Sequence, residues 1–236
     1  MDAQGTTVAA TDNLTKVYGD RVAVDRVTMT VQRGEVYGFL GPNGAGKTTT
    51  LRMLLGLVRP TSGTAYATGS VGALIEGPGF FPYLSGRANL RVLARHRGLP
   101  DAEVERVLER VDLASRGDDR FKGYSLGMKQ RLVFAAALLH DPDVLVLDEP
   151  MVGLDPRSVR IVKDLLRART REGMTVFMST HTLAMAEEMA DRVGIMVRGQ
   201  LRFLGTIAEL RDHVAVETRS LENLYLELTA GAQPAG

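Results

Sequence analysis

A glycine-rich segment with the sequence GPNGAGKTT spans residues 41–49. It follows the short apolar stretch 36–40, which is typical of a buried strand, and it precedes residues 50–55, whose apolar positions suit a helix packed on a sheet. A strand, a glycine loop and a helix in this order form the context in which the pattern GxxxxGK[ST] indicates phosphate binding. We therefore predict an α/β fold in which this loop binds a nucleoside triphosphate.

The residue types in this loop are those that phosphate binding requires. Glycines let successive backbone N–H groups approach phosphate oxygens, and a helix that begins near Lys47 presents the positive end of its dipole to the same anion. Lys47 has the reach to contact the β- and γ-phosphates, and the Thr48 hydroxyl is placed to ligate Mg²⁺. The predicted nucleotide-binding residues of the loop are Gly41, Pro42, Asn43, Gly44, Ala45, Gly46, Lys47, Thr48 and Thr49.

Two carboxylates follow the apolar stretch 144–147, which reads as a strand buried in a parallel sheet. Open α/β sheets bind ligands at the carboxyl ends of their strands, where Asp148 and Glu149 are expected to lie. Asp148 is predicted to hold Mg²⁺ or its hydration shell, and Glu149 to position and deprotonate an attacking water. An isolated Asp-Glu pair reads equally as a solvated loop, but a phosphate loop 101 residues upstream (148 − 47) favours catalysis.

Four residues carry weaker signals. Tyr18 lies upstream of the phosphate loop, where the sequence alone leaves open whether it stacks on a purine or only packs within a strand. Ser125 and Gly127 begin an apolar helix and predict either a plain N-cap or a second helix end open to an anion. His181 follows the apolar strand 174–178, where it is able to contact the γ-phosphate, although a lone histidine is more often structural.

The predicted fold class is α/β, with a P-loop NTPase core built on a mainly parallel sheet, an N-terminal antiparallel β portion and a helical insertion subdomain. Residues 14–19 and 22–31 read as strands joined by a turn, and Ser85 as the N-cap of the first inserted helix. A single domain is expected over residues 13–228, with its core at about 13–79 and 141–228 and its helical subdomain at about 80–140. Residues 1–12 and 229–236 are predicted to be flexible tails. An apolar stripe near the C-terminus reads as packing rather than ligand binding and comprises Leu221, Leu224, Tyr225 and Leu228.

Composition narrows the class of protein further. Lys and Arg number 29 against 28 Asp and Glu, so the net charge of +1 predicts no nucleic-acid partner. The absence of cysteine excludes disulfides and thiol catalysis and fits a reducing cytosol. The polar N-terminus does not resemble a signal peptide, and no apolar run approaches the ~20 residues that span a bilayer. Any action at a membrane is therefore expected to need a second, membrane-spanning chain.

Taken together, these motifs resemble the ATP-binding subunit of ABC transporters, over residues 14–228. Residues 41–49 match the family's Walker A motif, 144–149 its Walker B motif, 124–130 (YSLGMKQ) its signature sequence and 153–155 its D-loop. Tyr18 occupies the adenine-stacking position and His181 that of the switch histidine. The resemblance implies ATP and Mg²⁺ as ligands, catalytic roles for Glu149, His181 and Lys47, and nucleotide contacts from Ser125 and Gly127. The stretches IEGPGFFPYLSGRANL and SLENLYLEL resemble the bacterial subgroup of antibiotic and drug exporters.

Three features depart from the family pattern. The signature reads Ser-Leu-Gly instead of the commonest Ser-Gly-Gly, although Ser125 and Gly127 persist. The family's Q-loop glutamine is replaced by Glu76, whose carboxylate is expected to bind Mg²⁺ or water. Only 29 residues separate Lys47 from Glu76 (76 − 47), so either a strand pair is trimmed there or residues are missing from the chain.

The resemblance also implies partners. Two subunits, identical or paralogous, are expected to pair head to tail, with each ATP between residues 41–49 of one and Ser125 to Gly127 of the other. A multi-span membrane permease is the expected second partner, contacted through residues 76–83 from the cytoplasmic face of the membrane. Hydrolysis is expected to power export of a drug-like, antibiotic-like or lipid-like substrate.

Three alternatives to transport have less support in the sequence. A soluble ABC-type ATPase switch would carry long coiled coils or two cassettes, and the sequence shows neither. A regulatory module without turnover is disfavoured by the presence of both Glu149 and His181. A P-loop small-molecule kinase is disfavoured by the stretch YSLGMKQ.

Overall fold

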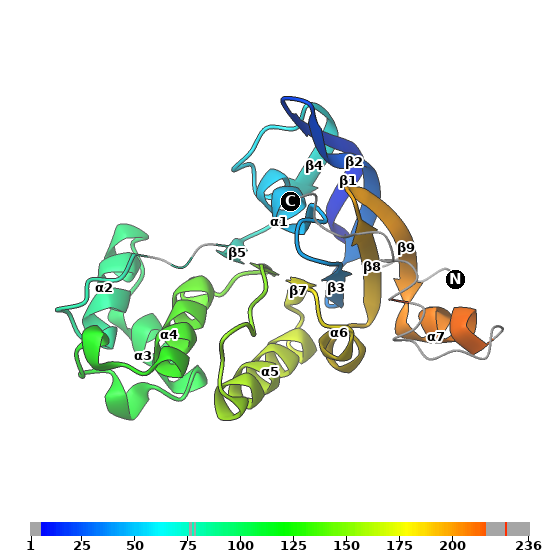
Figure 1. The fold of residues 1–236 in the computed structure, drawn as a ribbon. Helices are drawn as coiled ribbons and strands as arrows, with labels where there is room; N and C mark the ends of the chain where they lie inside the picture. The colour runs from blue at the N-terminus through cyan, green and yellow to red at the C-terminus, as the bar shows by residue number, and fades with distance from the viewer. Residues whose placement is uncertain (1–5, 76, 78, 216–224, 226–236) are drawn as a thin grey trace.

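The structure, a computed structural model, describes residues 6–75, 77, 79–215 and Tyr225. Its strands form a six-stranded sheet in the order β5-β6-β7-β3-β8-β9 and a three-stranded sheet in the order β2-β1-β4 (Figure 1). This architecture agrees with the predicted α/β class. The expected C-terminal tail and three members of the apolar stripe (Leu221, Leu224 and Leu228) lie outside the described residues.

The six-stranded sheet is parallel except at one edge. Its parallel strands are β3 (Val36–Leu40), β5 (Val71–Leu74), β6 (Val144–Leu147), β7 (Thr175–Thr180) and β8 (Arg192–Val197), and β9 (Gln200–Thr206) pairs antiparallel with β8. Every residue of β3, β6 and β7 is buried, as their apolar sequences predict for central parallel strands. The Phe177 ring meets Tyr37 and Phe39 edge to face, with centroids 5.1 and 5.7 Å away, and so fixes the packing of β7 on β3.

The three-stranded antiparallel sheet starts earlier in the chain than the sequence analysis predicts. It contains β1 (Thr7–Tyr18), β2 (Arg21–Gln32) and β4 (Ser62–Ala67). The prediction of a flexible tail over residues 1–12 is therefore wrong from Thr7 onward. β1 is the central strand of this sheet, so pairing on both edges holds Val8 and Ala9 in the core even though their side chains are small. Residues 7–12 carry mostly short side chains, so the alternation of apolar and polar residues there is too weak to predict a strand.

The connection between β4 and β5 is very short. Both strands are present, in different sheets, and only residues 68–70 join them. Asp143 fastens this link, because its carboxylate accepts a hydrogen bond from the Ser70 N–H at 2.9 Å and its own N–H donates to the Ser70 carbonyl at 2.8 Å. The short spacing between Lys47 and Glu76 therefore includes a connection of three residues between strands of two different sheets.

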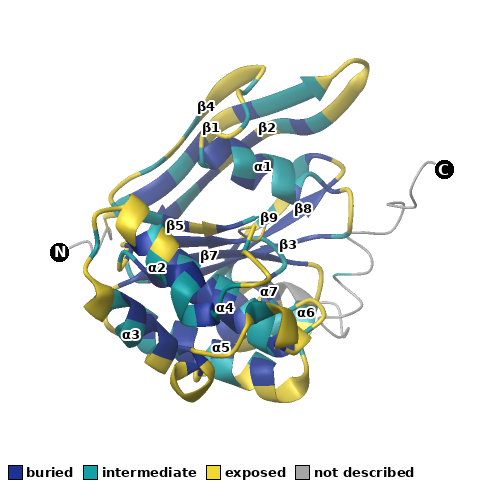
Figure 2. Cartoon of the chain, turned by 90° about the vertical axis from the view of Figure 1, so that its left-hand side faces the viewer, coloured by how far each residue is buried: buried dark blue, intermediate teal, exposed yellow. Residues whose placement is uncertain are grey.

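The described residues form seven α-helices. They are α1 (Lys47–Leu54), α2 (Gly86–His96), α3 (Asp101–Arg110), α4 (Leu126–Leu138), α5 (Pro156–Arg171), α6 (Leu183–Met189) and α7 (Ile207–Ala215), with 3-10 turns at Ala114–Arg116 and Phe121–Gly123. Helix α1 packs between the two sheets, since Leu51 shares one core with Phe39 and Val27 (Figure 2). Helices α2, α3 and α4 lie between β5 and β6 in the sequence and form a separate lobe, with α5 beside it (Figure 1).

Serine caps begin two of the inserted helices, as predicted. The Ser85 hydroxyl accepts from the Ala88 N–H at 3.1 Å, and the Ser125 hydroxyl accepts from the Met128 N–H at 3.2 Å. Each bond satisfies one N–H that has no partner within its own helix. The division of the chain into a core and a helical subdomain remains a prediction.

His140, at the end of α4, joins the helical lobe to the core sheet. Its Nε2 lies 3.2 Å from the Val71 carbonyl of β5, and its Nδ1 contacts the Arg97 guanidinium at the end of α2. The neighbouring Asp141 carboxylate pairs with Arg106 and Arg110 of α3, in the helical lobe, and with Arg169 of α5, beside the lobe. Burial lowers the pKa of His140 below its usual value of 6.5, and the positive charge of Arg97 lowers it further.

This lowered pKa predicts a pH-dependent stability. Below pH 6.5 the unfolded chain binds a proton at His140 that the folded chain does not, so the free energy of unfolding is expected to fall as the pH drops from 6.5 toward the folded pKa. Above that window the contribution is fully present. In the variant His140→Gln, urea unfolding between about pH 5.5 and 7.5 should show a shallower pH dependence than in the wild type. An unchanged slope would contradict the assignment.

Candidate functional site

The glycine loop follows β3 and leads directly into α1. Gly46, the residue before the helix, has a φ of 109°, and a Cβ atom there would lie 2.3 Å from the Ala23 carbonyl oxygen, so only glycine fits. It provides no side-chain cap, so the first N–H groups of α1 face the space above the loop. The loop therefore has the conformation in which backbone amides and a helix end surround an anion.

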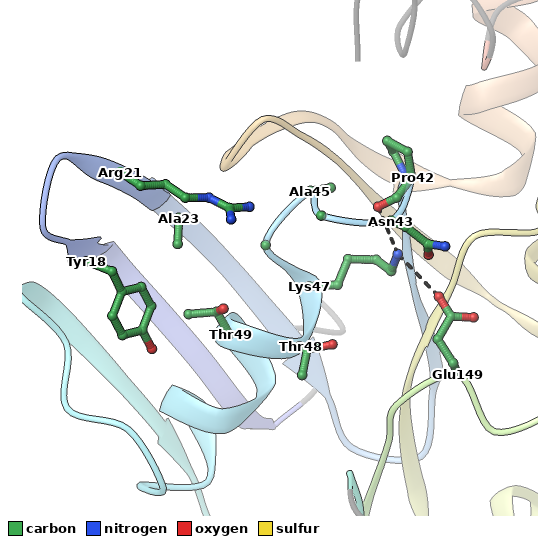
Figure 3. A pocket seen from close by; sticks show the side chains of 12 residues that line it. Tyr18, Arg21, Ala23, Pro42, Asn43, Ala45, Lys47, Thr48, Thr49 and Glu149 are labelled. Carbon is green, nitrogen blue, oxygen red and sulfur yellow. Dashed lines mark hydrogen bonds and ion pairs between the residues drawn. The ribbon is translucent and has the colours of Figure 1, made fainter. Parts of the chain in front are cut away.

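Lys47 lies under the loop and is 5% exposed. Its Nζ donates to the Gly41 carbonyl at 2.6 Å and to the Pro42 carbonyl at 3.2 Å, and it lies 3.3 Å from Glu149 Oε1 (Figure 3). The amine is thus held at the mouth of the loop by two carbonyls and one carboxylate. A buried cation in this position can contact the terminal phosphates of a nucleotide.

A cavity of about 400 Å³ lies beside the loop. It is lined by Tyr18, Arg21, Ala23, Pro42, Asn43, Gly44, Ala45, Gly46, Lys47, Thr48, Thr49 and Glu149 (Figure 3). Tyr18 is 49% exposed at the end of β1, with Lys16 Nζ 4.8 Å from the centre of its ring. Arg21, which the sequence analysis missed, extends from the start of β2 toward the loop (Figure 3). Arg21 follows Tyr18 by three residues, across a two-residue turn, and this proximity is the feature of the sequence that indicates a place in the same site.

Oxygen atoms gather where the loop meets the end of β6. The Thr48 hydroxyl donates to Asp148 Oδ2 at 2.6 Å, and Ser179 of β7 donates to the other carboxylate oxygen. A hydroxyl and a carboxylate next to a phosphate site are the ligands that Mg²⁺ prefers, so this donor set fits the ion. Within the described ranges no three His, Cys, Asp or Glu side chains form a metal-binding group. Glu76, the third predicted ligand, lies outside the described residues.

Glu149 connects the ends of three parallel strands. Its backbone has a φ of 47°, in the left-handed region that few residues other than glycine adopt, and its N–H donates to the Ser179 hydroxyl at 3.0 Å. This conformation directs Oε1 to Lys47 and places Oε2 2.9 Å from His181 Nδ1. The structure thus brings together all three residues predicted to be catalytic. Strained backbone of this kind occurs mostly at functional sites.

The signature residues lie apart from this cavity. Ser125 is exposed at the start of α4, and the residues described as lining the cavity include neither Ser125 nor Gly127. Gly127 is buried, since a Cβ atom there would lie 2.3 Å from Ser158 Oγ and 2.4 Å from Asp155 Oδ2. Asp155 caps α5 by accepting from the Ser158 N–H at 3.0 Å, and hydrogen bonds from Ser158 lower the pKa of its carboxyl. Gly127 therefore packs α4 against α5 within one chain.

The fold and the site together define a P-loop nucleoside triphosphatase, because a glycine loop encloses the mouth of a cavity next to a carboxylate that can accept a proton. Within this class, the chain belongs to the ABC transporter family. The family model described as ABC transporter matches residues 24–152. The chain is accordingly an ATP-binding subunit that hydrolyses ATP, as the sequence motifs predict.

Three known proteins illustrate the similarity. The bacitracin transport ATP-binding protein BcrA of Enterococcus faecalis is 43% identical over 217 residues, covering 86% of this chain and 70% of BcrA. The Nod factor export ATP-binding protein I of Cupriavidus metallidurans is 39% identical over 222 residues, covering 87% of this chain and 72% of that protein. A solved ATP-binding subunit of an ABC transporter superposes with a TM-score of 0.83 at 30% identity, covering 94% of this chain and 99% of that one.

None of the helices within the described ranges has the length and apolar character that crossing a bilayer requires.

Proposed function

We propose that this chain powers the export of an antibiotic-like, drug-like or lipid-like molecule through a separate membrane-spanning subunit. The names of its relatives, one a bacitracin transport and the other a Nod factor export ATP-binding protein, support this direction and substrate class. The subunit would act on the cytoplasmic face of the membrane. The partner would dock near residues 79–83, where Phe81 and Tyr83 are 42% and 65% exposed.

The residues of the cavity take distinct roles in this proposal. Tyr18 stacks on adenine, the loop amides and Lys47 hold the phosphates, and Gly41 acts through the carbonyl that orients the Lys47 amine. Thr48 and Asp148 would hold Mg²⁺, and Glu76 is the third ligand proposed from the sequence. The ion when bound would neutralise charge on the β- and γ-phosphates.

Glu149 and His181 act on the water that attacks the γ-phosphate. The Glu149 carboxylate accepts a proton from this water, and His181 orients the carboxylate and contacts the phosphate. The 2.9 Å contact between them supports this division of roles.

The position of Ser125 is the observation that best supports ATP-dependent pairing of two subunits. It lies exposed at a capped helix end, beside Leu126 at 65% exposure, outside the cavity of its own chain. A helix end open to an anion gains a ligand if a second subunit brings its bound ATP to that surface. We infer that two subunits close head to tail on ATP and open after hydrolysis, because the γ-phosphate attracts both helix ends at once.

Light scattering after size exclusion tests this pairing. Glu149→Gln, which is expected to retain ATP, should shift from the monomer mass of 25.6 kDa to twice that mass on addition of ATP and Mg²⁺. Adding Ser125→Glu should keep the protein monomeric, because a carboxylate at this helix end repels the phosphate. Ser85→Glu places the same charge on the other serine-capped helix and should not prevent pairing. Equal pairing of the two double variants would contradict the head-to-tail arrangement.

A further inference from the structure

Tyr225 is the only described residue after Ala215, and it lies against the loop that carries His181. Its hydroxyl donates to the backbone carbonyl oxygen of His181 at 3.3 Å, across 44 residues of sequence. The half-buried Tyr225 ring packs in the same apolar cluster as Leu183 and Phe203. One side chain thus links an apolar cluster near β9 to the site of hydrolysis.

The loop that Tyr225 contacts is short. His181 directly follows β7, and α6 begins two residues later at Leu183. The N-cap residue of α6, Thr182, makes no side-chain capping bond, while its N–H donates to the Thr180 hydroxyl at 3.1 Å. A hydrogen bond at the His181 carbonyl therefore acts on the one backbone segment that sets the direction of the imidazole.

The electrostatic surroundings keep Tyr225 a hydrogen-bond donor. Burial raises the pKa of the Tyr225 hydroxyl, and the negative charge of Glu149 raises it further. The hydroxyl therefore remains protonated near neutral pH.

We propose that Tyr225 is a positioning residue for ATP hydrolysis: by holding the His181 carbonyl, it keeps the imidazole of His181 against the Glu149 carboxylate. This inference rests on the roles proposed above for Glu149 and His181. It gives the C-terminal part of the chain a function in turnover, where the sequence pattern predicts only packing. Tyr225 itself makes no contact with the nucleotide in this scheme.

Tyr225→Phe tests the contact, since it removes the hydroxyl and keeps the ring in its cluster. Hydrogen exchange of the wild-type and variant chains should show faster exchange, by about 3–10-fold, in peptides covering residues 179–183, the scale of one lost hydrogen bond. Peptides from α4 should be unchanged, which separates a local effect from general destabilisation. Tyr66→Phe, an exposed tyrosine on β4, is the matched control and should leave all peptides unchanged.

Steady-state kinetics test the consequence for turnover. Tyr225→Phe should lower kcat for ATP by about 3–10-fold and leave KM and ATP affinity unchanged, because the hydroxyl acts only through His181. Unchanged kcat, or a lower kcat without faster exchange at residues 179–183, would overturn the proposal. If Glu149→Gln, made as the only substitution, left turnover intact, that result would instead contradict the proposed role of Glu149. The exchange measurement would in that case still decide whether Tyr225 holds the loop.

Discussion

Replacing Glu149 by glutamine is expected to lower kcat for ATP hydrolysis by about 10²–10⁴-fold, the contribution of a general base, while ATP binding is retained. Glutamine has the shape of glutamate but cannot accept the proton of the attacking water. Its amide can still occupy the position between Lys47 and His181, where the carboxylate oxygens lie 3.3 and 2.9 Å from the two side chains. The loop and the cavity should therefore keep their form.

Phosphate release and calorimetry measure the two halves of this prediction on the same preparation. Glu188→Gln is the matched control, because Glu188 is an exposed carboxylate that pairs with Lys163 on the surface. It should hydrolyse ATP at the wild-type rate. Near-wild-type turnover in Glu149→Gln would remove Glu149 from the mechanism.

Lys47→Ala should weaken ATP binding by about 10–150-fold, which corresponds to about 1.5–3 kcal/mol for hydrogen bonds to a charged group. The amine is 5% exposed and already held by the Gly41 and Pro42 carbonyls, so it is in place before the phosphates arrive. Its removal also leaves Glu149 without its neighbouring cation.

The choice of ligand and control makes this prediction specific. Adenosine, which carries no phosphate, should bind wild type and Lys47→Ala equally, because Lys47 is expected to contact phosphates only. Lys163→Ala removes a lysine that pairs with Glu188 and is not among the residues that line the cavity, and it should bind ATP like the wild type. Equal calorimetric affinity of Lys47→Ala and wild type for ATP would contradict the assigned role.

The parts of the site that the sequence predicted are contiguous in the chain. The glycine loop, its lysine and the Asp-Glu pair after β6 are each specified by a short local pattern: a buried strand followed by residues of fixed chemistry. The order of the strands could not be read from such patterns. It places β7 between β6 and β3, and so brings Lys47, Glu149 and His181 together at the carboxyl ends of these strands.

Other features depend on contacts between distant segments, so short local patterns indicate them weakly or not at all. Arg21 reaches the cavity only because the hairpin of β1 and β2 lies over the loop. His140 joins Val71 to Arg97 across 69 and 43 residues. The left-handed backbone of Glu149 was equally unpredictable, because strain at a functional residue opposes its local preference.

The short link between β4 and β5 has a mechanical consequence. Three residues reach at most about 11 Å when fully extended, and Asp143 already fixes the last of them. The link therefore restricts how far β4 of one sheet can move relative to β5 of the other. If adenine pulls the hairpin that carries Tyr18 toward the loop, this short link transmits part of the displacement into β5, the strand that precedes the inserted helices.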